Sequence, residues 1–161
     1  MDWAEICVNP VLRELPFKIQ TDKWGHIVMS PATNERGMYQ AKIVASLSRL
    51  LDAGAIITEC SIQTREGIKV ADVAWASDDF IVRNRGDNPF REAPELCVEI
   101  LPPSKTVMEM DEKMELYFAR GAKEFWICDK CDKNGNITFH KNTGEISRSE
   151  LAGNLPNPVL I

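Results

Sequence analysis

Apolar and polar residues follow one another along the chain in patterns that predict a regular order of strands and helices. Two alternating segments on either side of a tight turn predict a β-hairpin over 18–29. From Met38 onwards, apolar residues recur at helical spacing until a glycine ends the pattern. Thr33 or Asn34 is placed to cap this helix, because both side chains can accept a backbone N–H at a helix start.

The second half of the chain continues with short apolar runs separated by turn residues. These runs predict strands over 55–63 and 68–76, a short element over 79–83, a strand over 94–101, a helix from Ser104 to Gly121, and strands over 124–128 and 137–140. The tail over 151–161 predicts an edge strand or a cover for one face of the sheet. Strands and helices are thus mixed along the chain, as in α/β and α+β proteins.

Two acidic residues interrupt strands that are otherwise apolar. Asp72 lies within Lys69-Val-Ala-Asp-Val-Ala-Trp, and Glu99 lies within Glu95-Leu-Cys-Val-Glu-Ile-Leu. Burying an ionised carboxylate costs several kcal/mol unless a partner or a metal compensates. If the two strands are neighbours, as their order allows, alternation along each strand brings both carboxylates to one rim of the sheet. This pattern favours a divalent cation site; the alternative is that each carboxylate pairs with an arginine or lysine.

The helix that follows Glu99 carries a polar row beside its apolar stripe. Glu109, Lys113 and Tyr117 stand four residues apart and therefore lie on one line along the helix. This row can point back toward Glu99, where an ammonium could orient water or stabilise charge on a phosphate. The alternative is an ordinary pair of glutamate and lysine on a helix surface.

Composition narrows the class of protein. With 161 residues, 44% of them hydrophobic, the chain fits one domain spanning 1–161. A net charge of −5 argues against tight non-specific binding of nucleic acid, so any DNA contact requires a local patch. No segment reaches the roughly 18–20 apolar residues of a membrane span, and we expect a cytoplasmic protein. An odd number of cysteines, five, favours reduced thiols.

Several motifs, in order, resemble those of a known family. They are Leu-Pro-Phe-Lys-Ile at 15–19, Ile-Val-Met-Ser-Pro at 27–31, and the segments 69–77, 94–101 and 121–129. Together they are similar to the bacterial putative restriction endonuclease family of the PD-(D/E)XK nuclease superfamily. The resemblance implies an α/β (α+β) fold with a restriction-endonuclease-like core, in which helices flank a central mixed β-sheet and an N-terminal β-hairpin is added.

The resemblance also implies roles for individual residues. Asp72, Glu99 and the backbone carbonyl of Ile100 match positions that hold magnesium or manganese for hydrolysis of DNA. Lys113 matches a helix lysine that replaces the usual lysine after the second acid, since Leu101 stands at that position. Many restriction-like nucleases act as dimers, and we expect a homodimer.

The outer positions match less closely. Tyr117 and Gln40 correspond to supporting residues of the family, and Glu109 stands where relatives commonly have aspartate. On the first long helix, Lys42 occupies a position where some relatives have glutamate. Lys42 cannot serve as the acidic ligand that this helix supplies in those relatives.

Two other interpretations of the sequence stay open. Cys128 and Cys131 have the spacing of half a zinc site, although a second pair of ligands is missing. The pair could also be redox-active, but it does not open a helix as thioredoxin-like sites do. Alternatively, the chain is a catalytically silent interaction or regulatory module on a nuclease fold, which its acidic charge would suit.

Overall fold

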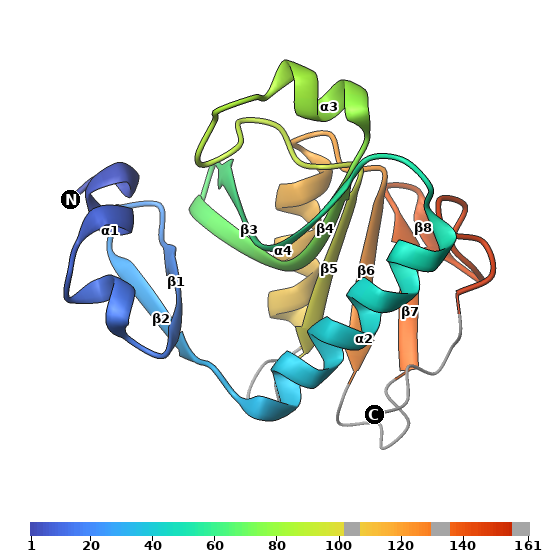
Figure 1. The fold of residues 1–161 in the computed structure, drawn as a ribbon, viewed down its shortest axis with the longest axis horizontal. Coiled ribbons are helices and arrows are strands. Elements are labelled where there is room, and N and C mark those ends of the chain that lie inside the picture. The colour runs from blue at the N-terminus through green and yellow to red at the C-terminus, as the bar shows by residue number, and fades with distance from the viewer. Residues whose placement is uncertain (102–106, 130–135, 156–161) are drawn as a thin grey trace.

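The computed structural model describes residues 1–101, 107–129 and 136–155 (Figure 1). The elements are α1 (Trp3–Val8), the 3-10 helix η1 (Leu12–Glu14), β1 (Phe17–Thr21), β2 (Ile27–Pro31), α2 (Asn34–Leu50), β3 (Ala55–Thr64), β4 (Gly67–Ala76), α3 (Asp78–Arg83), β5 (Leu96–Leu101), α4 (Val107–Phe118), β6 (Glu124–Asp129), β7 (Asn136–Lys141) and β8 (Gly144–Ile146). Strands β3 to β8 form one six-stranded sheet in chain order, and β1 and β2 form a separate hairpin. The sheet is mixed, because β5 and β6 are parallel and the other neighbours are antiparallel.

Helices α2 and α4 cover opposite faces of the sheet (Figure 1). The alternation of side chains along β5 shows this division, since Val98 belongs to the core beneath α2 and Cys97 to the core beneath α4. From α2, the buried residues Tyr39, Ile43 and Leu47 recur every four positions and form one apolar stripe. The predicted α/β (α+β) fold, with a mixed sheet between helices and an N-terminal hairpin, is therefore confirmed.

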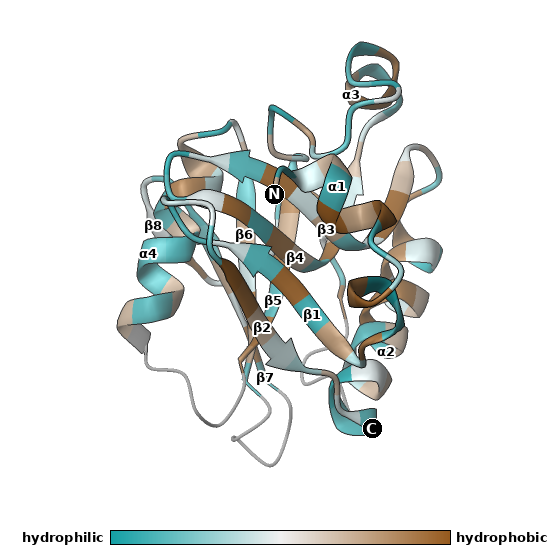
Figure 2. Cartoon of the chain, turned by 90° about the vertical axis from the view of Figure 1, so that its left-hand side faces the viewer, coloured by the Kyte–Doolittle hydropathy of each residue, from teal (hydrophilic) through white to brown (hydrophobic). Residues whose placement is uncertain are grey.

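Strand β1 of the hairpin lies beside β4 (Figure 2). The two strands are joined by side-chain contacts rather than by a continuous ladder. The backbone N–H of Ile68 donates to Thr21 Oγ1 at 2.8 Å, and that of Val70 donates to Gln20 Oε1 at 3.1 Å. These bonds satisfy backbone groups that would otherwise be buried without a partner. The hairpin thus closes over the part of β4 that carries Asp72.

Most element predictions are confirmed, with small shifts at the ends. Thr33 caps α2 by accepting the N–H of Arg36, and the strand predicted over 94–101 begins at Leu96. The short element over 79–83 is the helix α3. The sequence patterns did not indicate α1 or η1, which precede the hairpin. In the described part of the chain, no helix is both long and apolar enough to cross a bilayer.

The tail was predicted to add an edge strand or to cover one face of the sheet. Strand β8 forms one edge of the sheet, and the described tail residues 151–155 form no strand. Leu151 and Leu155 instead pack against the core beneath α2, which agrees with the other half of the prediction. The start of a helix at Ser104, the turn after Cys131, and residues 156–161 lie outside the described residues.

Candidate active site

Strands β4 and β5 part at the two carboxylates. Their antiparallel pairing extends as far as Val73 and Val98, and the next pair would join Asp72 to Glu99. Along these two strands, which are fully described, that pair is absent. The Asp72 Oδ2 atom instead accepts the backbone N–H of Ile100 at 2.7 Å. The prediction that the acidic residues lie on neighbouring strands is confirmed, and both lie where the ladder opens.

Side chains from three elements fill this opening. The carbonyl of Val70 accepts a hydrogen bond from Lys113 Nζ of α4 at 3.2 Å. The carbonyl of Asp72 accepts one from Gln40 Nε2 of α2 at 3.1 Å. Together with Gln20 of β1, these side chains replace the backbone partners that β5 no longer supplies. The fold therefore supplies side-chain partners for the backbone groups of β4 that face this opening.

Asp72 is completely buried and surrounded by cations. Its Oδ1 atom accepts a hydrogen bond from Lys18 Nζ at 2.7 Å and another from the guanidinium of Arg36. Burial raises the pKa of this carboxyl group, but Lys18, Arg36 and Lys113 together outweigh burial and hold the pKa at about 2. Asp72 is consequently ionised at neutral pH. Lys18 Nζ also lies 3.6 Å from Glu99 Oε2, so one ammonium lies between both carboxylates.

Glu99 is bound from the α4 side. Lys113 Nζ lies 2.6 Å from Glu99 Oε1, and the hydroxyl of Tyr117 donates to the same oxygen at 3.1 Å. Burial lowers the pKa of Lys113 to about 8, although the neighbouring Glu99 opposes this shift. Burial also raises the pKa of Tyr117 well above its usual range, which keeps the phenol protonated. The structure thus brings three sequence-predicted residues together: Glu99, Lys113 and Tyr117.

A second buried glutamate shows what distinguishes this cluster. Glu124 accepts hydrogen bonds from the indole of Trp126, the hydroxyl of Ser149 and the backbone N–H groups of Glu150 and Leu151. All of these donors are uncharged, and they fix the C-terminal segment to β6. Asp72 and Glu99 are instead held by three cationic groups, an arrangement that a purely structural carboxylate does not require.

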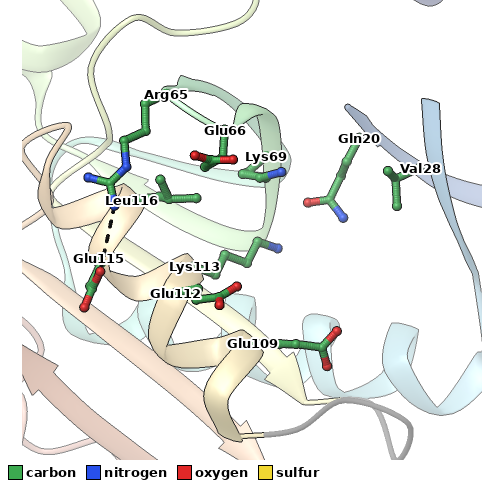
Figure 3. Close-up of a pocket in the computed structure, with 10 residues that line it drawn as sticks. All are labelled: Gln20, Val28, Arg65, Glu66, Lys69, Glu109, Glu112, Lys113, Glu115 and Leu116. Atoms are coloured by element: carbon green, nitrogen blue, oxygen red, sulfur yellow. Dashed lines mark ion pairs between the residues drawn. The ribbon is translucent and has the colours of Figure 1, made fainter. Parts of the chain in front are cut away.

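The other predicted residues lie around this centre. Gln40 links the Asp72 carbonyl to Glu59, whose Oε1 accepts the Gln40 amide at 2.6 Å. Glu109 is exposed on α4 and lies at the rim of a pocket toward which Lys113 points (Figure 3). Ile100 contributes its backbone N–H to Asp72.

Two pockets flank the cluster. The α4 pocket has a volume of about 510 Å³, and its lining includes Gln20, Lys69, Glu109 and Lys113 (Figure 3). The α2 pocket has a volume of about 470 Å³, and its lining includes Arg13, Lys18, Arg36, Gln40 and Glu59. Acidic residues outnumber basic ones around the α4 pocket, whereas basic residues prevail around the α2 pocket. An anionic ligand is therefore better accommodated from the α2 side.

Sequence reasoning missed three residues of this site: Lys18, Arg36 and Glu59. Lys18 and Gln20 share one face of β1, but a charged residue in a short hairpin is usually exposed. Arg36 lies in the first turn of α2, where a basic residue interacts unfavourably with the helix dipole. This unusual placement is the sequence feature that could have indicated a role for Arg36. Its Nε atom is buried and has no hydrogen-bond partner in the described structure.

Glu59 adopts a left-handed backbone conformation opposite Asp72. Its φ angle is 52°, and the register of β3 and β4 skips the pair that these two residues would form. Such a conformation costs a residue with a Cβ about 1–2 kcal/mol. We expect Glu59→Gly to be more stable than Glu59→Ala by about 0.5–1 kcal/mol, because both lose the contact with Gln40 and only alanine retains the strain. Denaturant unfolding of the two variants measures this difference, and equal stabilities would contradict it.

The donor atoms of the cluster suit an oxygen-preferring divalent cation, with one condition. Carboxylate oxygens such as those of Asp72 and Glu99 are ligands that magnesium and manganese prefer. In the described residues, however, no group of three histidine, cysteine or acidic side chains forms a site that could hold a metal ion. Lys18 lies between the two carboxylates, so a metal ion could bind both of them only after this ammonium withdraws.

Cysteine chemistry finds little support at the described positions. Cys128 is a free, fully buried thiol, and burial raises its pKa to about 12. A thiol with such a pKa stays protonated and is a poor nucleophile at neutral pH. Cys131, its partner in the predicted zinc half-site, lies outside the described residues.

The fold and the family agree with the nuclease resemblance. A putative nuclease of the DUF820 group from Anabaena variabilis ATCC 29413 has a similar structure, with a TM-score of 0.66 at 15% identity over 80% of each chain. At this identity the likeness concerns the fold, which is that of a nuclease-like protein. Residues 24–159 match the Uma2 family, described as putative restriction endonuclease, and the chain belongs to this family. No curated protein matches the chain.

Proposed function

We propose that this protein is a metal-dependent endonuclease that hydrolyses phosphodiester bonds in DNA. The observation that carries the proposal is the opening between β4 and β5, where two buried carboxylates meet a helix lysine. The family and its nuclease-like fold support the same reaction class. Magnesium or manganese is the proposed cofactor.

In this proposal, Asp72, Glu99 and the carbonyl of Ile100 hold the cation. The chemistry that the cation supplies is activation of a water molecule and stabilisation of charge on the phosphate. Lys113, which lies 2.6 Å from Glu99, positions the attacking water and stabilises the developing charge. Water adds to phosphorus and releases a proton to solvent, the ester P–O bond breaks, and the leaving oxygen takes up a proton from solvent.

Supporting residues hold these groups in place. Tyr117 fixes the orientation of Glu99 through its hydroxyl, and Gln40 fixes the backbone of Asp72. Glu109 contributes to the acidic rim on the α4 side. The DNA backbone approaches through the α2 pocket, whose lining carries Arg13 and Arg36 and whose charge suits a phosphate.

The proposed active form is a homodimer. Cutting both strands of a duplex in a single binding event takes two reaction centres, and the described part of this chain contains one cluster of this kind. Two copies of the chain would supply both centres.

Isosteric variants test the proposal. We expect Asp72→Asn and Glu99→Gln to lose nicking of a supercoiled plasmid in magnesium or manganese, and to bind manganese at least about tenfold more weakly by calorimetry. The amides keep the size of each side chain, and the amide oxygen introduced by Asp72→Asn would still accept the N–H of Ile100. Asp79→Asn, an exposed position on α3, serves as the matched control and should retain both properties.

One observation favours a second candidate, a catalytically silent interaction module. Both oxygens of Asp72 already have donors within this chain, so the carboxylate needs no metal to be stable. Wild-type protein that neither binds manganese nor nicks DNA would support this module. Nicking that persists in Asp72→Asn and Glu99→Gln would instead place the reaction elsewhere.

A further inference from the structure

Lys18 occupies the space between the two proposed metal ligands. Its Nζ atom lies 2.7 Å from Asp72 Oδ1 and 3.6 Å from Glu99 Oε2, and its side chain is only 4% exposed. Magnesium binds oxygen ligands at about 2.0–2.1 Å. A cation bound between these oxygens would therefore collide with the ammonium and be repelled by it. Lys18 and a metal ion therefore cannot bind the same carboxylate oxygens at the same time.

Lys18 lies on the hairpin, and this position allows a metal ion to replace its ammonium between the carboxylates. The residue comes from β1 of the hairpin, which is docked on β4 through side-chain contacts of Gln20 and Thr21. Its side chain is long and flexible, and it already forms part of the wall of the α2 pocket. Withdrawal into this pocket would remove the ammonium from both carboxylates without moving the six-stranded sheet.

The other two cations near the carboxylates, Arg36 and Lys113, each pair with only one of them. Of the two carboxylates, Arg36 pairs with Asp72 alone, and Lys113 is held by Glu99 together with the Val70 carbonyl. In the described structure, ion pairs to both carboxylates are made only by Lys18. Its removal therefore vacates the space where the metal would lie, while the other two cations stay paired.

We infer that Lys18 is a built-in competitor of the divalent cation. Its ammonium neutralises the two carboxylates when no metal is bound, and metal binding requires its withdrawal. The inference rests on the proposed metal-dependent function. It adds a residue that sets the metal concentration at which the site is filled.

Metal titration tests this role without reference to cleavage. Calorimetry with manganese alone should show that Lys18→Met binds the ion at least about tenfold more tightly than the wild type, because a competing charge is gone. The binding should disappear when Asp72→Asn is added to Lys18→Met. Lys23→Met, which removes an exposed lysine from the same hairpin, should bind manganese as the wild type does.

The outcomes separate this inference from the function on which it rests. Equal or weaker binding by Lys18→Met than by the wild type would overturn the competitor role and leave the metal site intact. Absence of binding in every variant would overturn the metal-dependent function itself. If Lys18→Met folds only when manganese is present, that rescue supports the inference. If neither Lys18→Met nor Lys18→Gln folds with manganese, Lys18 is a structural requirement and the inference fails.

Discussion

Replacing Asp72 by alanine is expected to lower the free energy of unfolding by about 3–5 kcal/mol. The variant removes the Asp72 carboxylate from the buried Lys18 and the half-buried Arg36, and it removes the acceptor of the Ile100 N–H. Stranded charges of this kind cost far more than the ion pair itself contributes. Denaturant unfolding in the presence of a chelator measures the effect. A loss below about 1 kcal/mol would show that the cluster rearranges freely.

The same prediction has a defined pH dependence. The folded protein holds the pKa of Asp72 at about 2, below the value of 3.8 that serves as its reference. A carboxyl group with a lowered pKa stabilises the fold fully above its unfolded pKa, and this contribution disappears as pH falls through the folded pKa. The difference between wild type and Asp72→Ala should therefore narrow between about pH 4 and pH 2.

Asp72→Asn should lose less stability than Asp72→Ala. The amide oxygen can still accept the N–H of Ile100, whereas the charge that pairs with Lys18 is lost in both variants. This difference is the reason that the amide is the better choice for activity measurements. A loss of cleavage in Asp72→Asn can then be separated from unfolding.

The second large effect is expected at Lys113. Replacing it by methionine should slow single-turnover cleavage by about 10²–10³-fold at saturating metal, because one preorganised cation beside the reacting phosphate is lost. Metal affinity should not fall, since Lys113 is not a ligand. The matched control is Lys42→Met, which removes an exposed lysine from α2.

A structural role for Lys113 would give a different result. Its ammonium also binds Glu99 and the Val70 carbonyl, so the variant should lose some stability in any case. A decrease in stability with an unchanged rate of cleavage would mean that Lys113 only holds the two strands. A decrease in rate at unchanged metal affinity would assign it to the chemical step.

Much of the fold could be predicted from local pattern. The helical stripe of α2, with Ile43 and Leu47 four residues apart, and the turn between β3 and β4 follow from short-range spacing. The missed helix α1 contains only six residues, too few for a clear helical period. The sequence left two roles open for the tail because Leu151 and Leu155 are apolar in either one, and only packing decides that these two residues cover the core beneath α2.

The sequence by itself determined that Asp72 and Glu99 are buried acids on strands, since an acidic residue in an apolar run departs from the local pattern. It also placed Lys113 and Tyr117 on one line of a helix, because helical spacing is a local property. Only the tertiary structure decided that Lys18 lies between both carboxylates. That contact joins a hairpin to strands more than fifty residues away, and its cause is the parting of β4 and β5, which no local spacing encodes.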